Sequence, residues 1–211
     1  MSDLCLYFAP GSCSRVTLIA LLETGAPFET ALVRFMKGEH RTPEFLGLNP
    51  KGKVPALIID GEALTENVAI LSLLNQMFPA ARLLPPVATA LDDARQTADL
   101  CFCSATLHPL VTRIVMPGRF AGPEGASKAY ELAVEAMRQF FTLVDERLAS
   151  CDWWYGDSWS VMDAYLSWVF GRVEGAKFPV ADYPHWAKHY QRMSARPSFQ
   201  RALEIEAAAT A

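Results

Sequence analysis

The segment best suited to chemistry is Ala9–Arg15 (Ala-Pro-Gly-Ser-Cys-Ser-Arg), which follows the short apolar run Leu4–Phe8. The run predicts a buried strand and the pattern after the segment predicts a helix, so Cys13 would stand at a helix N-terminus. Unsatisfied amides and the helix dipole favour negative charge there, and the nearby arginine adds positive charge. This predicts a lowered pKa for the Cys13 thiol and a reactive thiolate. The alternative is that Cys13 fills the core while Ser12 or Ser14 caps the helix.

A second feature is Asn49–Leu57 (Asn-Pro-Lys-Gly-Lys-Val-Pro-Ala-Leu). A proline at the start of a strand gives up a ladder hydrogen bond, so Pro55 needs an explanation. A cis Val54–Pro55 bond would turn the Val54 backbone outward, where it could pair with an extended peptide. An edge strand with a trans proline is the alternative, and the local pattern does not decide between them.

The third feature is Leu64–Ile70 (Leu-Thr-Glu-Asn-Val-Ala-Ile), where polar residues open a predicted helix. The free amides of such a helix start could bind a carboxylate, and Glu66 could hold an ammonium group. Ordinary N-capping by Thr65 would explain the same residues.

The elements that must position these features alternate between strand and helix before residue 79. Apolar spacing predicts a helix that starts near Val16 and ends at Gly25, a plausible left-handed terminator. Further strands are predicted over Phe28–Phe35, Val54–Ile59 and Ala63–Leu64, and a helix from Glu66 to about Phe78. The order β-α-β followed by β-β-α describes a small mixed sheet with helices packed on it.

The second half of the chain is almost purely helical. Three prolines interrupt the pattern between Pro79 and Thr89, and an amphipathic stripe then runs from Tyr130 to Leu148. Ser160–Asp163 predicts a capping box that opens an apolar helix reaching Phe170. We therefore expect an α/β domain over residues 1–80, a linker over 81–89 and an all-α domain over 90–211.

Composition excludes several function classes. The chain has 211 residues, of which 51% are hydrophobic and 20% charged, and its net charge is −4 with scattered Lys and Arg. These values indicate a folded protein without the basic surface of a nucleic-acid binder. No signal peptide, membrane span or paired metal-ligand spacing is predicted, and the five cysteines include no C-x-x-C. We expect a reduced, cytoplasmic protein with no metal and no membrane partner.

Together the three features resemble the glutathione site of the cytosolic glutathione transferases. The strand–Pro-Gly-Ser-Cys-Ser–helix segment, the Lys-Val-Pro segment and the Thr-Glu-Asn segment match that family in order and spacing over the first eighty residues. Trp153–Leu166 resembles the capping-box segment of the family's helical half. The Ala-Pro-Gly-Ser-Cys-Ser turn is most similar to the bacterial beta class. The resemblance implies a thioredoxin-like N-terminal domain joined to an all-α domain.

The resemblance also implies where glutathione binds. The Val54 backbone would pair with the cysteinyl part across a cis Pro55. Glu66 and Asn67 would hold the γ-glutamyl end, although most members have Ser where this chain has Asn67. Contacts to the backbone or the glycyl carboxylate are implied for Lys53 and for some of the loop residues Lys37, His40 and Arg41.

The catalytic residue implied by the resemblance depends on the class of the family. Gly11 occupies the position of the catalytic serine in serine classes such as theta, which argues against that mechanism. Beta-class members place a cysteine at Cys13, able to form a mixed disulfide with glutathione, and often a histidine at His108. Donors at Ser12–Ser14 would stabilise the glutathione thiolate. The apolar candidates for the wall of the acceptor site are Met116, Phe120, Trp168 and Phe170.

The resemblance implies that the chain transfers the glutathione thiolate to a small hydrophobic electrophile, with glutathione as co-substrate, and that it forms a homodimer. Within enzymes, the alternatives on the same scaffold are a lyase, a dehalogenase and a disulfide reductase that uses Cys13. A ligand-binding member without catalysis is the alternative from another class, and the intact motifs disfavour it.

Overall fold

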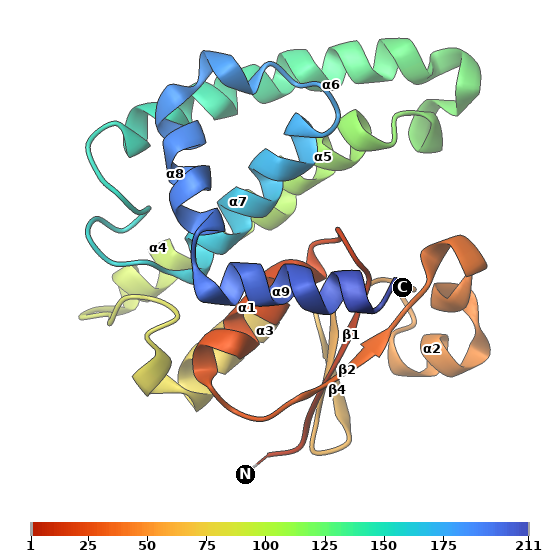
Figure 1. Ribbon diagram of the computed structural model, residues 1–211, viewed down its shortest axis with the longest axis vertical. Helices are drawn as coiled ribbons and strands as arrows, with labels where there is room; N and C mark the ends of the chain where they lie inside the picture. Colours follow the sequence, from red (N-terminus) through yellow and green to blue (C-terminus); the bar gives the residue numbers. More distant parts are fainter. Residues whose placement is uncertain (1, 211) are drawn as a thin grey trace. The chain divides into compact units, whose positions relative to one another are not determined.

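The structure, a computed structural model, describes residues 2–210 and consists of two compact units (Figure 1). The first unit runs to Leu83 and also contains the chain from Arg196 onward, and the second comprises Leu84–Ala195. The all-α domain expected over residues 90–211 therefore ends earlier than predicted. Its last helix joins the first unit because that helix packs against the first helix of the chain.

A four-stranded mixed sheet forms the centre of the first unit, in the order β2-β1-β3-β4. Strand β1 (Leu4–Phe8) pairs in parallel with β2 (Glu29–Leu32) and antiparallel with β3 (Ala56–Ile59), which pairs antiparallel with β4 (Glu62–Thr65). Alternate residues of β1 are fully buried, as its apolar pattern predicts. The observed β2 and β3 are shorter than the predicted strands.

Helices cover this sheet. Helix α1 (Ser14–Thr24) ends at Gly25, which has φ +68° as predicted, and packs against α3 (Asn67–Met77) and α9 (Pro197–Ala208). In Figure 1, α9 lies alongside α1. The other helical elements are short and were not predicted: η1 (Phe35–Lys37), η2 (Glu39–Arg41), α2 (Pro43–Leu48) and η3 (Pro79–Ala81).

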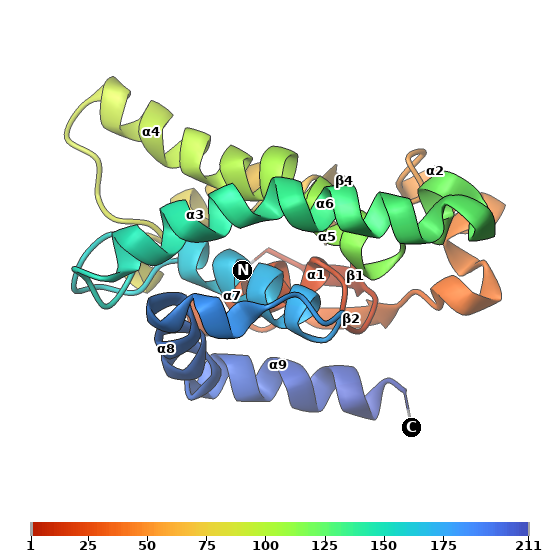
Figure 2. The ribbon, with the colours of Figure 1, turned by 90° about the horizontal axis from the view of Figure 1, so that it is seen from above.

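The described part of the second unit is helical. Its elements are α4 (Ala90–Cys101), the π-helix η4 (Phe102–Leu107), α5 (His108–Val115), α6 (Gly118–Leu148), α7 (Val161–Glu174), η5 (Val180–Asp182) and α8 (Pro184–Ser194). Helix α6 packs against α5 and α8, and α7 packs against the same two helices (Figure 2). Stacked and tilted rings of Phe141, Phe170 and Trp186 form the centre of this core.

No single helix within residues 2–210 has the length and apolar content needed to cross a membrane. The segments Ala90–Val115 and Gly118–Leu148 meet that test only as a pair bent by 69°.

Candidate active site

The Ala9–Arg15 turn is held together by its own serine hydroxyls. The Ser12 hydroxyl lies 2.8 Å from the Ala9 carbonyl oxygen and 2.7 Å from the Ser14 hydroxyl, and it accepts a bond from the Ser14 amide. The Ser14 hydroxyl lies 3.3 Å from the same carbonyl oxygen and accepts from the Ala9 amide. Because Ser14 is fully buried and both hydroxyls bond within the turn, their geometry is that of structural groups that fix the turn.

Cys13 is buried beside the second feature. It is the N-cap of α1 and only 8% exposed, and its Sγ lies 3.6 Å from the Val54 carbonyl oxygen. Burial raises the pKa of the Cys13 thiol to about 12; the cysteine's own backbone N–H, the Asn67 amide and the Lys53 charge act in the opposite direction, while Glu66 raises it further. The lowered pKa expected for Cys13 is therefore wrong, because desolvation outweighs the helix start.

The Val54–Pro55 peptide bond is cis, so that prediction is confirmed. Within residues 2–210 the Val54 amide has no hydrogen-bond partner, although the residue is only 7% exposed. Gly52, at φ +61°, precedes it at a close approach: a side chain there would meet the His40 carbonyl oxygen at 3.0 Å. The η2 helix thus lies directly against the Lys51–Lys53 segment.

The start of α3 is open. Its N-cap is Glu66, which has φ +79° and no side-chain capping bond, and among the described residues the amides of Asn67, Val68 and Ala69 have no partner. The alternative of ordinary N-capping by Thr65 is therefore not found. A non-glycine residue at positive φ carries strain that proteins tend to keep at functional sites.

The side chains around Glu66 differ from the prediction. The exposed Glu66 carboxylate lies 2.5 Å from Lys51 Nζ, which also donates to Thr65 at 2.7 Å. The Asn67 side chain is buried, where it donates to the Cys13 carbonyl and accepts from the Thr17 hydroxyl at 2.7 Å. Asn67 therefore connects α3 to α1 with its side chain, while its backbone amide has no partner in the described part of the chain.

Comparison with known proteins decides the family. Residues 11–77 match the model of the glutathione S-transferase N-terminal domain, and residues 127–192 match that of the C-terminal domain. A glutathione S-transferase of Escherichia coli O157:H7 is 32% identical over 95% of this chain and 98% of its own length. The chain belongs to the glutathione S-transferase family.

Solved structures of the family agree with this fold. A sphingomonad glutathione S-transferase in complex with glutathione has a TM-score of 0.84 and 34% identity, over 96% of this chain and 98% of its own. A bacterial beta class enzyme from Sphingomonas chungbukensis has the same TM-score and 33% identity, over the same shares. The predicted fold class and the predicted family are confirmed.

Three predicted glutathione contacts of this glutathione S-transferase lie in η1, in η2 and in the loop before Val54. Lys37 and Lys53 are exposed, and His40 packs its ring edge-on against Phe35 at 4.8 Å between centroids. The approach of η2 to Gly52 brings His40 close to the segment that carries Lys53. Roles for these three side chains toward a glycyl carboxylate stay predictions.

The residues expected at the acceptor site lie in the second unit. Phe170 is 1% exposed and packs against Phe141 and Trp186, so it belongs to the core and not to a ligand-facing wall. Trp168 is 4% exposed, and the centroid of its ring lies 4.6 Å from that of the His108 ring. Met116 and Phe120 are exposed. Nδ1 of His108 lies 3.3 Å from the Tyr165 hydroxyl, and His108 follows directly after η4, a helix type often found at functional sites.

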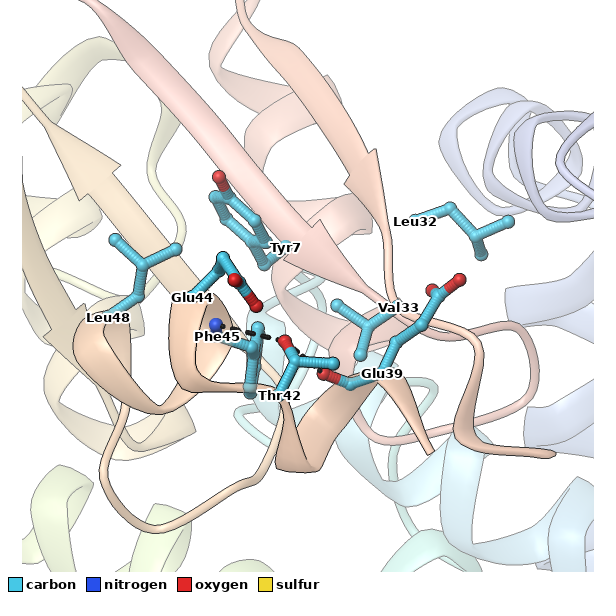
Figure 3. Close-up of a pocket in the computed structure, with 8 residues that line it drawn as sticks. All are labelled: Tyr7, Leu32, Val33, Glu39, Thr42, Glu44, Phe45 and Leu48. Carbon is cyan, nitrogen blue, oxygen red and sulfur yellow. Dashed lines mark hydrogen bonds between the residues drawn. The ribbon is translucent and has the colours of Figure 1, made fainter. Parts of the chain in front are cut away.

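A pocket of about 200 Å³ lies elsewhere in the first unit, between α2 and the ends of β1 and β2 (Figure 3). Apolar Leu32, Val33, Phe45 and Leu48 line it with Tyr7, and Glu39 and Glu44 lie at its side. Thr42, at its floor, caps α2 by accepting from the Phe45 amide. None of the predicted glutathione-binding residues lines this pocket.

Three side chains near the site were missed or misjudged from sequence. Lys51 was named only as part of a motif, yet it contacts Glu66. The charge of Arg15 is engaged by Glu206, 191 residues away. No local signal predicts the Glu206 contact, because a carboxylate near a chain end is usually a solvated surface group.

Proposed function

We propose that this glutathione S-transferase binds glutathione along Val54 and the start of α3, and transfers its thiolate to a small hydrophobic electrophile. The observation that carries the proposal is a set of first-unit amides, at Val54 and at Asn67–Ala69, that have no hydrogen-bond partner within residues 2–210. Buried backbone amides are almost always paired in folded proteins, so the open Val54 amide supports a peptide ligand at this edge.

Charge indicates where the two ends of glutathione bind. The γ-glutamyl carboxylate would accept from the open amides of α3, which the helix dipole makes attractive to anions. Its ammonium group would bind Glu66, whose exposed carboxylate already holds a cation in Lys51. Lys37, His40 and Lys53 would face the glycyl carboxylate. The proposal needs glutathione as co-substrate and no metal.

The chemistry requires an ionised glutathione thiol. A free thiol has a pKa near ~8.5, so few molecules are thiolates at neutral pH. The N–H of Cys13, which lowers the pKa of its own thiol, stands at the start of α1 and would favour a glutathione thiolate in the same way. The thiol proton leaves to solvent. The thiolate then forms a carbon–sulfur bond as the leaving group departs with its electron pair.

Binding and turnover test this proposal together. Titration calorimetry with glutathione should show one site per chain, and S-methylglutathione should still bind because the γ-glutamyl and glycyl ends are unchanged. A model aryl halide should then be conjugated in a glutathione-dependent reaction. Binding without conjugation of any electrophile in a panel would favour the ligand-binding alternative, and absence of binding would refute the proposal.

Disulfide reduction through Cys13 is a second candidate, favoured by the position of the Cys13 sulfur beside Val54. The Cys13 thiolate would attack a mixed disulfide of glutathione, release the other thiol and hold glutathione as a mixed disulfide, which a second glutathione thiolate would resolve. The raised pKa of Cys13 counts against this reaction. Replacement of Cys13 by Ala should abolish reduction and spare conjugation. Lyase and dehalogenase reactions would be distinguished by their products.

The assembly and the setting belong to the same proposal. We expect a homodimer, so light scattering should give about twice the 23.3 kDa of the chain. The described cysteines are all free thiols, which suits a reducing cytoplasm and a role in detoxification. A mass of one chain would contradict the dimer.

A further inference from the structure

Helix α9 is attached to α1 by a carboxylate at each end of the pair. At the C-terminal end of α1, Glu23 accepts from Arg196 at 2.7 Å and from the Ser198 hydroxyl at 2.5 Å. At the N-terminal end of α1, Glu206 binds Arg15. The two helices are therefore antiparallel, and the end of α9 lies against the start of α1, where the Ala9–Arg15 turn enters the helix (Figure 1).

Glu206 contacts the turn as well as the helix. Its side chain is only 6% exposed, and its Oε2 accepts from the Gly11 amide at 3.1 Å and from Arg15 Nη2 at 2.5 Å. Arg15 Nε donates to the same carboxylate at 3.1 Å. One carboxylate thus fixes a residue before Cys13 and a residue after it.

Stability alone is a weak explanation for this arrangement. A buried ion pair contributes little net free energy, because desolvation of both charges opposes their attraction. Its geometric consequence is specific: Gly11 has φ +71°, in the left-handed region that glycine readily adopts, and its amide is held from outside the turn. The serine hydroxyls hold the Ala9 side of the same turn from within. Cys13 lies between Gly11 and Arg15, which Glu206 holds, and between Ser12 and Ser14, so the direction of its N–H depends on both sets of contacts.

We propose that Glu206 is a positioning residue for the glutathione thiolate, acting through Gly11 and Arg15 so that the C-terminal helix sets the geometry of the active-site turn. The inference rests on the proposed function, in which the thiolate lies at the start of α1. It assigns to the end of the chain a part in catalysis without contact to substrate.

The test compares Glu206→Ala with Glu23→Ala, its matched control at the other end of the same helix pair. Both variants remove a carboxylate that joins α1 to α9, and both should lower Tm. Only Glu206→Ala should lower kcat/KM for conjugation, by about tenfold and mainly through kcat, because the loss of one charge-assisted hydrogen bond is of that size. Glu206→Gln keeps an oxygen acceptor for Gly11 and should recover most of the lost kcat; it also serves if the alanine variant does not fold.

Amide hydrogen exchange of residues 9–15 measures how firmly Glu206 holds the turn, and it does so without an activity assay. Exchange should rise in Glu206→Ala and stay near that of the parent protein in Glu23→Ala. Equal losses of kcat/KM in both alanine variants, or unchanged kcat and exchange in Glu206→Ala, would overturn the inference. A parent protein that binds no glutathione would instead refute the proposed function, and the exchange experiment would then still decide whether Glu206 holds the turn.

Discussion

Helices α3 and α7 begin in opposite ways. At α7 the buried Asp163 carboxylate accepts from the Ser160 amide and hydroxyl, from the Trp154 amide and from His189, all at 2.7–2.9 Å. At α3 the carboxylate of the N-cap residue Glu66 binds Lys51, and three amides have no partner among the described residues. The first start is closed by its own chain, whereas the second has hydrogen-bonding capacity left for a ligand.

The difference between these two helix starts shows that one contributes to stability and the other is suited to binding. A closed, buried helix start contributes to folding because each of its polar groups is satisfied. An open one at strained backbone gives up some of that stability, and the groups left over are those that an anionic peptide end needs. The start of α1 is intermediate between these two cases. The Ser12 and Ser14 hydroxyls satisfy most of the polar groups of the turn, and the Cys13 amide has no backbone partner among the described residues.

Asp163→Ala should have the largest effect of the variants considered. It removes the acceptor of four buried hydrogen bonds, so we expect a loss of about 3–5 kcal/mol in the free energy of unfolding, measured by urea denaturation. The exposed Asp157 offers a matched control, whose replacement by Ala should change stability by less than about 0.5 kcal/mol. Equal effects would show that the closed start of α7 is not what stabilises it.

Alkylation of Cys13 tests how closed the start of α1 is. Because burial raises its pKa to about 12, Cys13 should react with iodoacetamide at least about a hundredfold more slowly at pH 8 than the exposed Cys101. Only the thiolate reacts, so the Cys13 rate should keep rising as the pH increases toward that pKa. Peptide mapping after brief labelling measures both rates, and preferential labelling of Cys13 would show that its thiol is accessible and ionised in solution.

Glu66→Ala should weaken glutathione binding without lowering stability. Loss of a charge-assisted hydrogen bond to the γ-glutamyl ammonium is expected to raise Kd by about tenfold or more, measured by calorimetry. Lys51→Met, which removes the cation that Glu66 now holds, is the control and should change Kd by less than about threefold, as expected of an exposed ion pair. An unchanged Kd in Glu66→Ala would mean that the γ-glutamyl end lies elsewhere.

The smallest effect is expected for Glu66→Gly. Glycine tolerates φ +79° better than glutamate does, so the substitution should relieve backbone strain. Glycine also gives the unfolded chain more conformational entropy, which lowers stability. Because the two effects oppose each other, the free energy of unfolding should stay within about 1 kcal/mol of the parent value. Thermal unfolding with and without glutathione would separate the two roles: the unliganded Tm should hold, and the shift produced by glutathione should shrink. A large fall in the unliganded Tm would make Glu66 a structural residue.

The features predicted correctly are those that depend on neighbours along the chain. The strand–turn–helix order from Leu4 to Gly25 and the Ser160–Asp163 capping box were predicted, because strand periodicity, turn residues and caps act over a few residues. The local pattern left the Val54–Pro55 isomer open, and the family resemblance implied the cis bond that the structure contains. The family resemblance rested on the same local motifs.

The contacts that these motifs make depend on segments far apart along the chain, which no local pattern reveals. The burial of Cys13 beneath Val54, the engagement of Asn67 by Thr17 and the reach of Glu206 to Gly11 join residues 41, 50 and 195 positions apart. The pKa of a thiol and the partners of an amide depend on which groups surround them in space. Desolvation by distant segments outweighed the local helix start at Cys13, and a carboxylate from the end of the chain engaged the charge of Arg15.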